Sequence, residues 1–284
     1  MTPLLRTTAL TFLAVMALYE GALRLAAPAV DQGEDIGTTN AIRLENYTDR
    51  ATDPDTVIVG SSLGGRMQVR MIPRDWSNIA ISGGSPRTGL AVVAAGPRHP
   101  KRVLIEINNL DRGGDPATVH QLLGWPQPLL RRIFWFYRSG YMPINLVFSE
   151  VESALNRRRA AHGGDAETPP ANFPDLLALQ QASYAKPPDT AHMADVAGLV
   201  RQLRAQGIQV GFFEMPVDRS LVNSPRLTAL RRSVKAMFAP KEYCWLSIDQ
   251  GDAWHTGDGE HLLLQDAAIA ARRLAAARCG AAPH

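Results

Sequence analysis

The strongest constraint on the fold is a series of short apolar segments that each end in small polar residues. Residues 56–59 (TVIV) lead into GSSLGG, and residues 102–107 (RVLIEI) lead into NNLD. Segments of this length and composition are typical of strands that are buried on both faces of a parallel sheet. Further strands are expected within WSNIAIS (76–82), IQVGFFEMP (208–216) and YCWLSID (243–249).

Helical patterns separate these expected strands. Residues 193–207 (MADVAGLVRQLRAQG) place apolar side chains at helical spacing and end at a glycine. The alternation predicts an α/β fold with a parallel sheet covered by helices on both faces, in which ligands bind at the carboxyl ends of the strands. Other helices are expected from about Leu63, within 89–96 and 224–240, and from 258 toward the C-terminus.

Composition excludes some classes of function. The 284 residues are 45% hydrophobic and 20% charged, and a net charge of +3 is too balanced to predict nucleic-acid binding. No Cys/His cluster has zinc-site spacing, so neither a metal nor an organic cofactor is expected. Cys244 and Cys279 can pair in an oxidising compartment or remain two unpaired small apolar residues.

Residues 1–28 predict a signal anchor or a signal peptide. Residues 9–19 are apolar behind Arg6, and a helix can continue through Glu20 and Arg24 because residues four apart can form an ion pair. An anchor with Arg6 inside places the rest of the chain in the periplasm, on the inner membrane; cleavage would release it there. A buried helix of a cytosolic domain is the less favoured alternative.

The remaining chain divides into three parts. Residues 29–54 are polar and predict a linker, and residues 55–280 form the α/β domain. Residues 113–193 interrupt the alternation and are interpreted as a helical and loop insertion. Within it, residues 133–142 (IFWFYRSGYM) favour core packing, with a membrane-facing lid or an aromatic platform for sugar rings as alternatives.

Ser62 is the candidate nucleophile. A serine hydroxyl needs a base, and Asp258 and His261, three apart in an expected first helical turn, can supply one. The carboxylate would orient one imidazole nitrogen while the other accepts the serine proton. The competing interpretation makes Ser62 a helix N-cap; Asp258 can cap with one oxygen and orient His261 with the other. His255 has no such aspartate and is expected at the surface or in contact with substrate.

An oxyanion would need donors from neighbouring strand ends. Gly83 follows the second strand, and Asn108 and Asn109 follow the third. A backbone N–H at a glycine turn and an asparagine amide are suitable donors. Asn109 is favoured over Asn108.

In these residues the chain resembles the SGNH/GDSL hydrolase superfamily. Its Gly-Asp-Ser-Leu block is matched by GSSL (60–63), with Ser61 in place of the aspartate, and its Asp-x-x-His block by DGEH (258–261). NIAISG (78–83) resembles the second block. EINNLD (106–111) departs from the usual Gly-x-Asn-Asp of the third. The likeness covers about residues 55–112 and 195–278.

This resemblance implies a flavodoxin-like three-layer α/β/α sandwich, a Ser62–His261–Asp258 triad and an oxyanion hole of Ser62 N–H, Gly83 N–H and Asn109. It implies an acetylesterase or O-acetyltransferase for envelope glycans, acting on an acylated glycan or small acyl ester, with a multi-spanning membrane acyltransferase as a possible partner. The alternatives are a catalytically weak glycan-binding or assembly module and a lipase-like enzyme.

Overall fold

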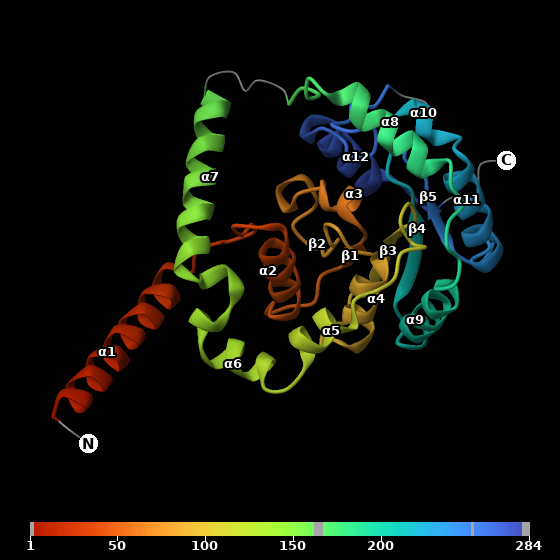
Figure 1. Cartoon of the computed structure of the whole chain (residues 1–284). Coiled ribbons are helices and arrows are strands. Elements are labelled where there is room, and N and C mark those ends of the chain that lie inside the picture. The colour runs from red at the N-terminus through yellow and green to blue at the C-terminus, as the bar shows by residue number, and fades with distance from the viewer. Residues whose placement is uncertain (1–2, 162–166, 251–252, 280–284) are drawn as a thin grey trace.

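The computed structural model describes residues 3–161, 167–250 and 253–279. Its centre is a five-stranded parallel sheet with the strand order β2-β1-β3-β4-β5 (Figure 1). All five expected strands are present, so the α/β prediction is confirmed. The strands are β1 (Thr56–Val59), β2 (Trp76–Asn78), β3 (Arg102–Glu106), β4 (Gln209–Phe213) and β5 (Cys244–Leu246).

The strand register aligns the chain segments that leave the sheet. Val59, the last residue of β1, pairs with Ile105 in β3. Pairing also continues beyond β2, because the N–H of Ile81 donates to the carbonyl oxygen of Gly60 (3.0 Å). The residues that follow β1, β2 and β3 therefore lie along one edge of the sheet, as parallel strands require.

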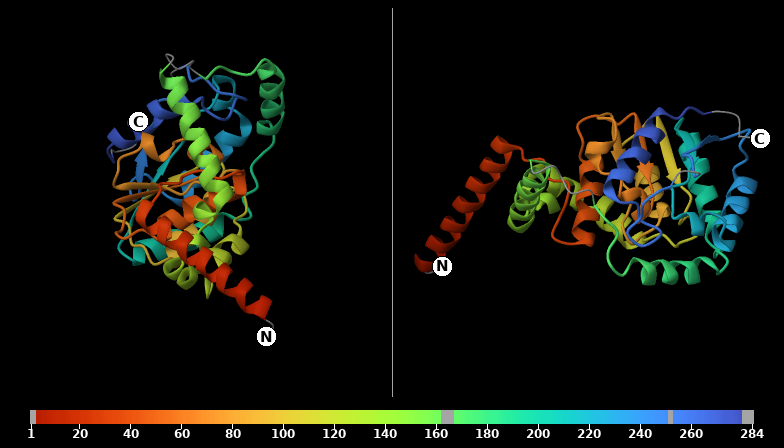
Figure 2. Two further views of the ribbon diagram at one scale, coloured as in Figure 1. Left: turned by 90° about the vertical axis from the view of Figure 1, so that its left-hand side faces the viewer. Right: turned by 90° about the horizontal axis from the view of Figure 1, so that it is seen from above.

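Both faces of the sheet are covered by apolar side chains. Val57, Val59 and Ile105 point into one buried cluster, and Ile58 and Leu104 point into a second. The first cluster includes side chains of α4 and α9, and the second includes side chains of α3 and α12; Figure 2 shows the helices around the sheet. These helices are α3 (Ser62–Gly65), α4 (Pro86–Ala95), α9 (Met193–Ala205) and α12 (Leu264–Ala276).

The segment expected to be a linker is instead a packed helix. In α2 (Ile36–Thr48), Asp35 caps the first turn by accepting the N–H of Thr38 (2.7 Å). Ile42, Leu44 and Tyr47 are fully buried against the domain. The prediction of a linker was wrong. Polar residues outnumber apolar ones in this segment, which made it resemble a linker, but its few apolar side chains are enough to pack the helix against the core.

The insertion is predominantly helical and connects β3 to β4. Residues 162–166, part of the segment expected to be a loop, lie outside the described residues. The elements of the insertion are α5 (Pro116–Leu123), α6 (Gln127–Ile133), η2 (Trp135–Tyr137), η3 (Ser139–Tyr141), α7 (Pro143–Ala161) and α8 (Phe173–Tyr184). Outside the insertion, the remaining elements are η1 (Val69–Met71), α10 (Arg219–Val222) and α11 (Pro225–Met237).

The aromatic segment of the insertion does not pack into the core. Ile133, Phe134, Tyr137 and Met142 are all exposed, and the backbone forms the two short 3₁₀ turns η2 and η3. The core-packing interpretation of residues 133–142 was therefore wrong. Apolar content alone does not distinguish a core segment from an exposed apolar surface.

The N-terminal helix α1 (Pro3–Ala26) projects away from the domain (Figures 1 and 2). It is long and apolar enough to cross a membrane, a property that signal sequences share. Leu23 is its one buried side chain among the residues described, so the alternative in which this helix is buried was wrong.

The two cysteines form a disulfide. Cys244 at the start of β5 is bonded to Cys279, three residues after the end of α12. The bond fixes the C-terminal helix to the edge strand of the sheet. The open question of whether these cysteines pair is answered in favour of pairing.

We expect this disulfide to stabilise the fold measurably, because it closes a loop with a sequence separation of 35. The double change Cys244→Ser and Cys279→Ser should lower the free energy of unfolding by about 2–4 kcal/mol in denaturant titrations. Wild-type protein unfolded in reductant should lose the same amount. Equal stability of the oxidised wild type and the variant would contradict this expectation.

Candidate active site

The turn after β1 exposes one serine and buries its neighbour. Ser61 is the N-cap of α3, because its Oγ accepts the N–H of Leu63 (3.3 Å), and it is completely buried. Ser62 is the first residue of the helix and is half-buried. The capping interpretation of Ser62 was therefore wrong. Because Ser61 performs that role, the Ser62 hydroxyl is available for other contacts.

The Asp258–His261 segment is a closed bend and not the helical turn that the sequence predicts. The N–H of Gly257 donates to the carbonyl oxygen of His261 (2.8 Å), and an antiparallel bridge joins Thr256 to Leu262. Gly259 has a φ of +95°, a conformation that favours glycine. The helix α12 begins only at Leu264.

Asp258 both shapes this bend and orients the histidine. One carboxylate oxygen, Oδ1, accepts the backbone N–H groups of Glu260 (2.9 Å) and His261 (2.8 Å). The other, Oδ2, lies 2.7 Å from Nδ1 of the His261 ring. One oxygen therefore orients His261, as the sequence predicts, whereas the other holds a turn and not the predicted helix N-terminus.

The structure joins the three predicted catalytic residues into one hydrogen-bonded chain. His261 Nε2 lies 2.8 Å from Ser62 Oγ, across a sequence separation of 199 residues. Asp258 at Nδ1 favours the tautomer whose proton is on Nδ1, which leaves Nε2 as the acceptor for the serine proton. The three side chains thus have the geometry of a nucleophile, a base and an orienting carboxylate.

The charges around His261 raise its pKa and lower that of Asp258. Burial opposes the charged imidazolium, but the hydrogen bond and charge of Asp258, together with the charge of Glu260, raise the pKa of His261 above its ordinary value. Burial also opposes the charged Asp258, but its hydrogen bonds with His261 and Glu260 and the attraction of the imidazolium lower its pKa to about 2. Asp258 is therefore ionised throughout the range in which His261 titrates.

Two backbone N–H groups at the carboxyl edge of the sheet are the candidate oxyanion donors. Among the described residues, the N–H groups of Ser62 and Gly83 donate to no protein acceptor. Gly83 has a φ of +74°, and its loop is held because the amide of Asn40 exchanges hydrogen bonds with the backbone of Ser82 in both directions (2.9 and 3.0 Å). Backbone donors without a protein acceptor, at the ends of the two neighbouring strands β1 and β2, are suited to a developing oxyanion.

The two predicted asparagines have structural partners. Asn108 Nδ2 donates to the carbonyl oxygen of Met215 (3.0 Å), and its Oδ1 accepts the N–H of the same residue (2.8 Å). Asn109 is completely buried, and its Nδ2 donates to Ser61 Oγ (3.0 Å) and to Glu260 Oε1 (3.4 Å). The structure therefore does not present either amide as a free oxyanion donor, because their N–H groups are directed at protein acceptors.

Sequence reasoning missed Glu106, the carboxylate beneath the nucleophile. Its side chain is fully buried at the end of β3 and accepts hydrogen bonds from Ser61 Oγ (2.7 Å), Ser61 N (2.9 Å) and Gly64 N (2.8 Å). Burial raises the pKa of Glu106 more than these hydrogen bonds lower it. One sequence signal was present: an acidic residue directly follows the apolar run 103–105 in β3, where an unpaired charge would be unfavourable.

Glu260 connects this buried network to the insertion. Its Oε1 accepts the hydroxyl of Tyr184 in α8 (2.8 Å) as well as the amide of Asn109. Burial raises the pKa of Tyr184, and the negative charge of Glu260 raises it further. The insertion therefore stabilises the loop that carries His261. His255, by contrast, is exposed, and its Nδ1 lies 3.4 Å from Asp266 Oδ2.

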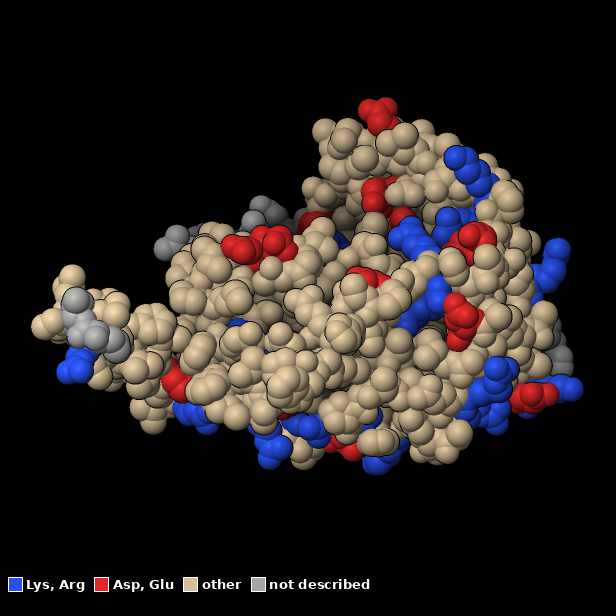
Figure 3. Space-filling model, turned by 60° about the horizontal axis from the view of Figure 1, so that its bottom comes forward, with Lys and Arg blue, Asp and Glu red and all other residues tan. Residues whose placement is uncertain are grey.

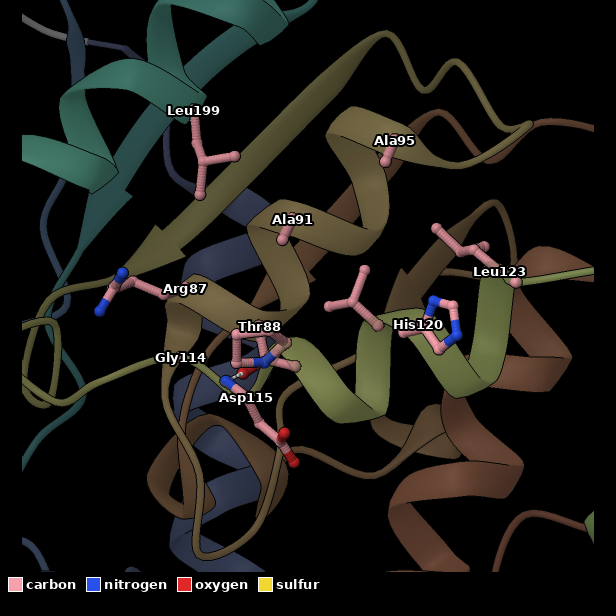
Figure 4. Close-up of a pocket in the computed structure, with 12 residues that line it drawn as sticks. Arg87, Thr88, Ala91, Ala95, Gly114, Asp115, His120, Leu123 and Leu199 are labelled. Atoms are coloured by element: carbon pink, nitrogen blue, oxygen red, sulfur yellow. Dashed lines mark hydrogen bonds between the residues drawn. The ribbon is translucent and has the colours of Figure 1, made fainter.

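A surface pocket of about 480 Å³ lies outside the site. It is lined by residues of α4, α5 and α9, among them Ala91, His120 and Leu199 (Figure 4). Ser62 and His261 do not line it. Within the described ranges, no group of three or more His, Cys, Asp or Glu side chains is arranged to hold a metal ion.

Comparisons of the chain with protein-family models, with curated proteins and with solved structures return no match. The assignment of a function therefore depends on the geometry of the site.

We expect the reactivity of Ser62 toward a fluorophosphonate to follow the deprotonation of His261. The second-order rate should fall with decreasing pH, with a midpoint above 6.5 because the pKa of His261 is raised. Asp258→Asn removes the main interactions that raise this pKa, so its midpoint should shift to lower pH and its maximal rate should fall. An unchanged midpoint in Asp258→Asn would contradict the proposed role of the carboxylate.

We also expect Glu106 to stabilise the turn that carries Ser62. Glu106→Ala leaves three buried donors without an acceptor and should lower the free energy of unfolding by about 2 kcal/mol or more. Glu106→Gln, which keeps one oxygen for the backbone N–H groups, should lose less. Chemical denaturation of both variants tests this order, and the reverse order would contradict it.

Proposed function

We propose that the protein is a serine enzyme that cleaves or transfers acyl groups of esters. The observation that carries this proposal is the continuous hydrogen-bonded chain from Ser62 through His261 to Asp258 at the carboxyl edge of the sheet. A half-buried serine hydroxyl 2.8 Å from an oriented imidazole is the arrangement that nucleophilic catalysis needs. A structural serine would have no requirement for this pairing.

In the first half of the reaction, His261 Nε2 takes the proton from Ser62 Oγ as the oxygen attacks the ester carbonyl carbon. The carbonyl oxygen becomes an oxyanion and is stabilised by the N–H groups of Ser62 and Gly83. The intermediate then collapses, the bond to the leaving alkoxide breaks, and the imidazolium donates its proton to it. The products are a free alcohol and an acyl group on Ser62 Oγ.

In the second half, an incoming hydroxyl resolves the acyl-enzyme. His261 removes its proton, and the oxygen attacks the acyl carbon; the intermediate collapses, and the proton returns to Ser62 Oγ. Water as the acceptor gives a carboxylic acid and hence an esterase. A sugar hydroxyl gives a new ester and hence an O-acetyltransferase, so both activities use the same triad.

The resemblance to the SGNH/GDSL hydrolase superfamily belongs to this proposal. The strand order 2-1-3-4-5 is that of flavodoxin-like doubly wound sheets and supports the likeness. The positions of Ser62, Gly83 and the Asp258–His261 pair at one sheet edge support it further. The third block departs from the superfamily pattern, since Asn109 here pairs with Ser61 and Glu260.

The proposed compartment is the periplasm, with α1 as an anchor in the inner membrane. The disulfide Cys244–Cys279 favours an oxidising compartment, and α1 supplies a helix of sufficient length. Release into the periplasm after cleavage of α1 is the alternative. An enzyme in that position would act on acylated envelope glycans, with a multi-spanning membrane acyltransferase as the partner that supplies acyl groups.

A second candidate function is a catalytically weak module that binds envelope glycans. The observation that favours it is the buried Asn109 amide, which leaves the candidate oxyanion hole with two backbone donors and no side-chain donor. Loss of one such donor lowers the rate of acyl transfer by about 10²–10³. This candidate predicts glycan binding with little turnover of esters.

We expect a fluorophosphonate probe to label the full chain at Ser62. Ser62→Ala should abolish labelling and the hydrolysis of short acyl esters such as p-nitrophenyl acetate. Ser61→Ala is the matched control because it keeps the nucleophile and its base, and it should retain labelling. Gel fluorescence and peptide mapping provide the readout.

The other outcomes discriminate between the candidates. Absence of labelling in folded wild-type protein would contradict the enzyme and favour the glycan-binding module. Preference for long acyl chains, lost when the insertion is altered, would favour a lipase-like enzyme over one that transfers acetyl groups.

A further inference from the structure

Two exposed apolar surfaces of the insertion begin near the end of α1, and the helix that carries the second one runs away from α1 (Figures 1 and 2). We call the first the aromatic collar: the exposed side chains of Leu129, Ile133, Phe134, Tyr137 and Met142. We call the second the α7 stripe: the exposed side chains of Ile144, Val147, Phe148, Val151 and Leu155. Contiguous exposed apolar surface of this kind is unusual in soluble domains and marks an interaction site.

The α7 stripe is the outward side of a helix whose polar side faces the domain. Its members recur at helical spacing, so they share one face of α7. On the opposite face, Asn145 is buried and accepts the N–H of Glu34 (3.1 Å), and Ser149 and Ser153 line a cavity of about 660 Å³ next to α2. This orientation is the reverse of that expected for a helix of a water-soluble protein.

The collar is attached to the last two turns of α1. The Glu20 carboxylate accepts the N–H groups of Trp135 (3.0 Å) and Phe136 (3.2 Å), and Arg24 donates to the carbonyl oxygen of Ile133 (2.6 Å). The hydroxyl of Tyr19 in α1 donates to a carbonyl oxygen of η3 (2.5 Å). Wherever the end of α1 lies in a membrane, the collar lies at the same depth.

The length of α1 places its last two turns, and with them the collar, at the edge of the hydrocarbon core of a bilayer. Residues 7–19, between Arg6 and Glu20, are 13 uncharged residues and span only about 20 Å as a helix. A bilayer core is about 30 Å thick, so the turns that carry Glu20 and Arg24 must cover the remainder. Glu20 and Arg24 form an ion pair (2.7 Å) and are hydrogen-bonded to the backbone next to the collar. These contacts lower the free-energy cost of placing the two charges at the edge of the hydrocarbon core.

The side chains around the collar suit a membrane interface. Arg24 and Arg138 lie over the ring of Trp135, with guanidinium carbons 5.5 and 5.0 Å from its centre, and Arg132 is exposed. Aromatic rings combined with basic side chains are typical of the level of lipid headgroups. Figure 3 shows a broad uncharged surface beside α1, and Lys and Arg side chains, with fewer Asp and Glu among them, lie along its lower margin.

We propose that the aromatic collar and the α7 stripe form a second membrane-contact surface, which rests on the lipid bilayer beside α1. The proposal rests on the anchoring of the chain by α1. Continuity with α1 and the basic margin favour lipid over a protein partner as the occupant. The contact fixes the domain against the membrane, whereas a single helix with a flexible linker would leave its orientation free.

Single-cysteine fluorophores on the full chain test this proposal in lipid nanodiscs that contain nitroxide-labelled lipids. The native cysteines are paired and do not react. The reporters are Ile133→Cys in the collar and Val147→Cys in the stripe. Leu179→Cys is the matched control, an apolar side chain that is 68% exposed on α8. Leu10→Cys reports whether α1 itself is in the bilayer.

We expect the labels at 10, 133 and 147 to be quenched several-fold more than the label at 179. If the label at 10 is quenched and the labels at 133 and 147 are both not, the membrane-contact surface is overturned and the anchor is retained. A protein partner would then be the expected occupant of the two surfaces. Absence of quenching at 10 would overturn both. Because the readout does not depend on catalysis, its failure is distinct from a failure of Ser62 to react.

Discussion

The site depends on the hydrogen bonds that the carboxylate of Asp258 accepts. One of its oxygens holds the bend by accepting two backbone N–H groups, and the other holds the ring of His261. The bend presents the imidazole to the edge of the sheet, and the sheet presents Ser62 to the imidazole. Without this carboxylate, neither the direction of the ring nor the position of its proton would be fixed.

The rest of the molecule supports the two sides of that contact separately. On the serine side, buried Glu106 satisfies the donors of the turn after β1, and Ser61 caps α3 so that Ser62 does not have to. On the histidine side, Tyr184 and Asn109 hold Glu260, which precedes His261 in the bend. The buried amide of Asn109 connects the two sides, because it donates both to Ser61 and to Glu260. Buried hydrogen bonds therefore fix the geometry of the site.

The sequence predicted the parts of this structure that depend on local pattern. The five strands, the Ser62–His261–Asp258 chain and the compatible roles of the Asp258 oxygens follow from periodicity and from the sheet-edge rule. The failures concern tertiary contacts. Pattern alone could not show that residues 36–48 pack as a helix, that the aromatic segment faces outward, or that Asn109 points down to Ser61 and not toward the oxyanion.

The protonation of the His261 ring tests the central claim most directly. Nitrogen NMR of histidine-labelled protein, with the resonances assigned through their loss in His261→Gln, reports both the tautomer and the titration of this ring. The account predicts a proton on Nδ1 and a bare Nε2 above the pKa, with a titration midpoint above the ordinary value. A proton on Nε2, or rapid exchange between both tautomers, would contradict the role of Asp258 and with it the activation of Ser62.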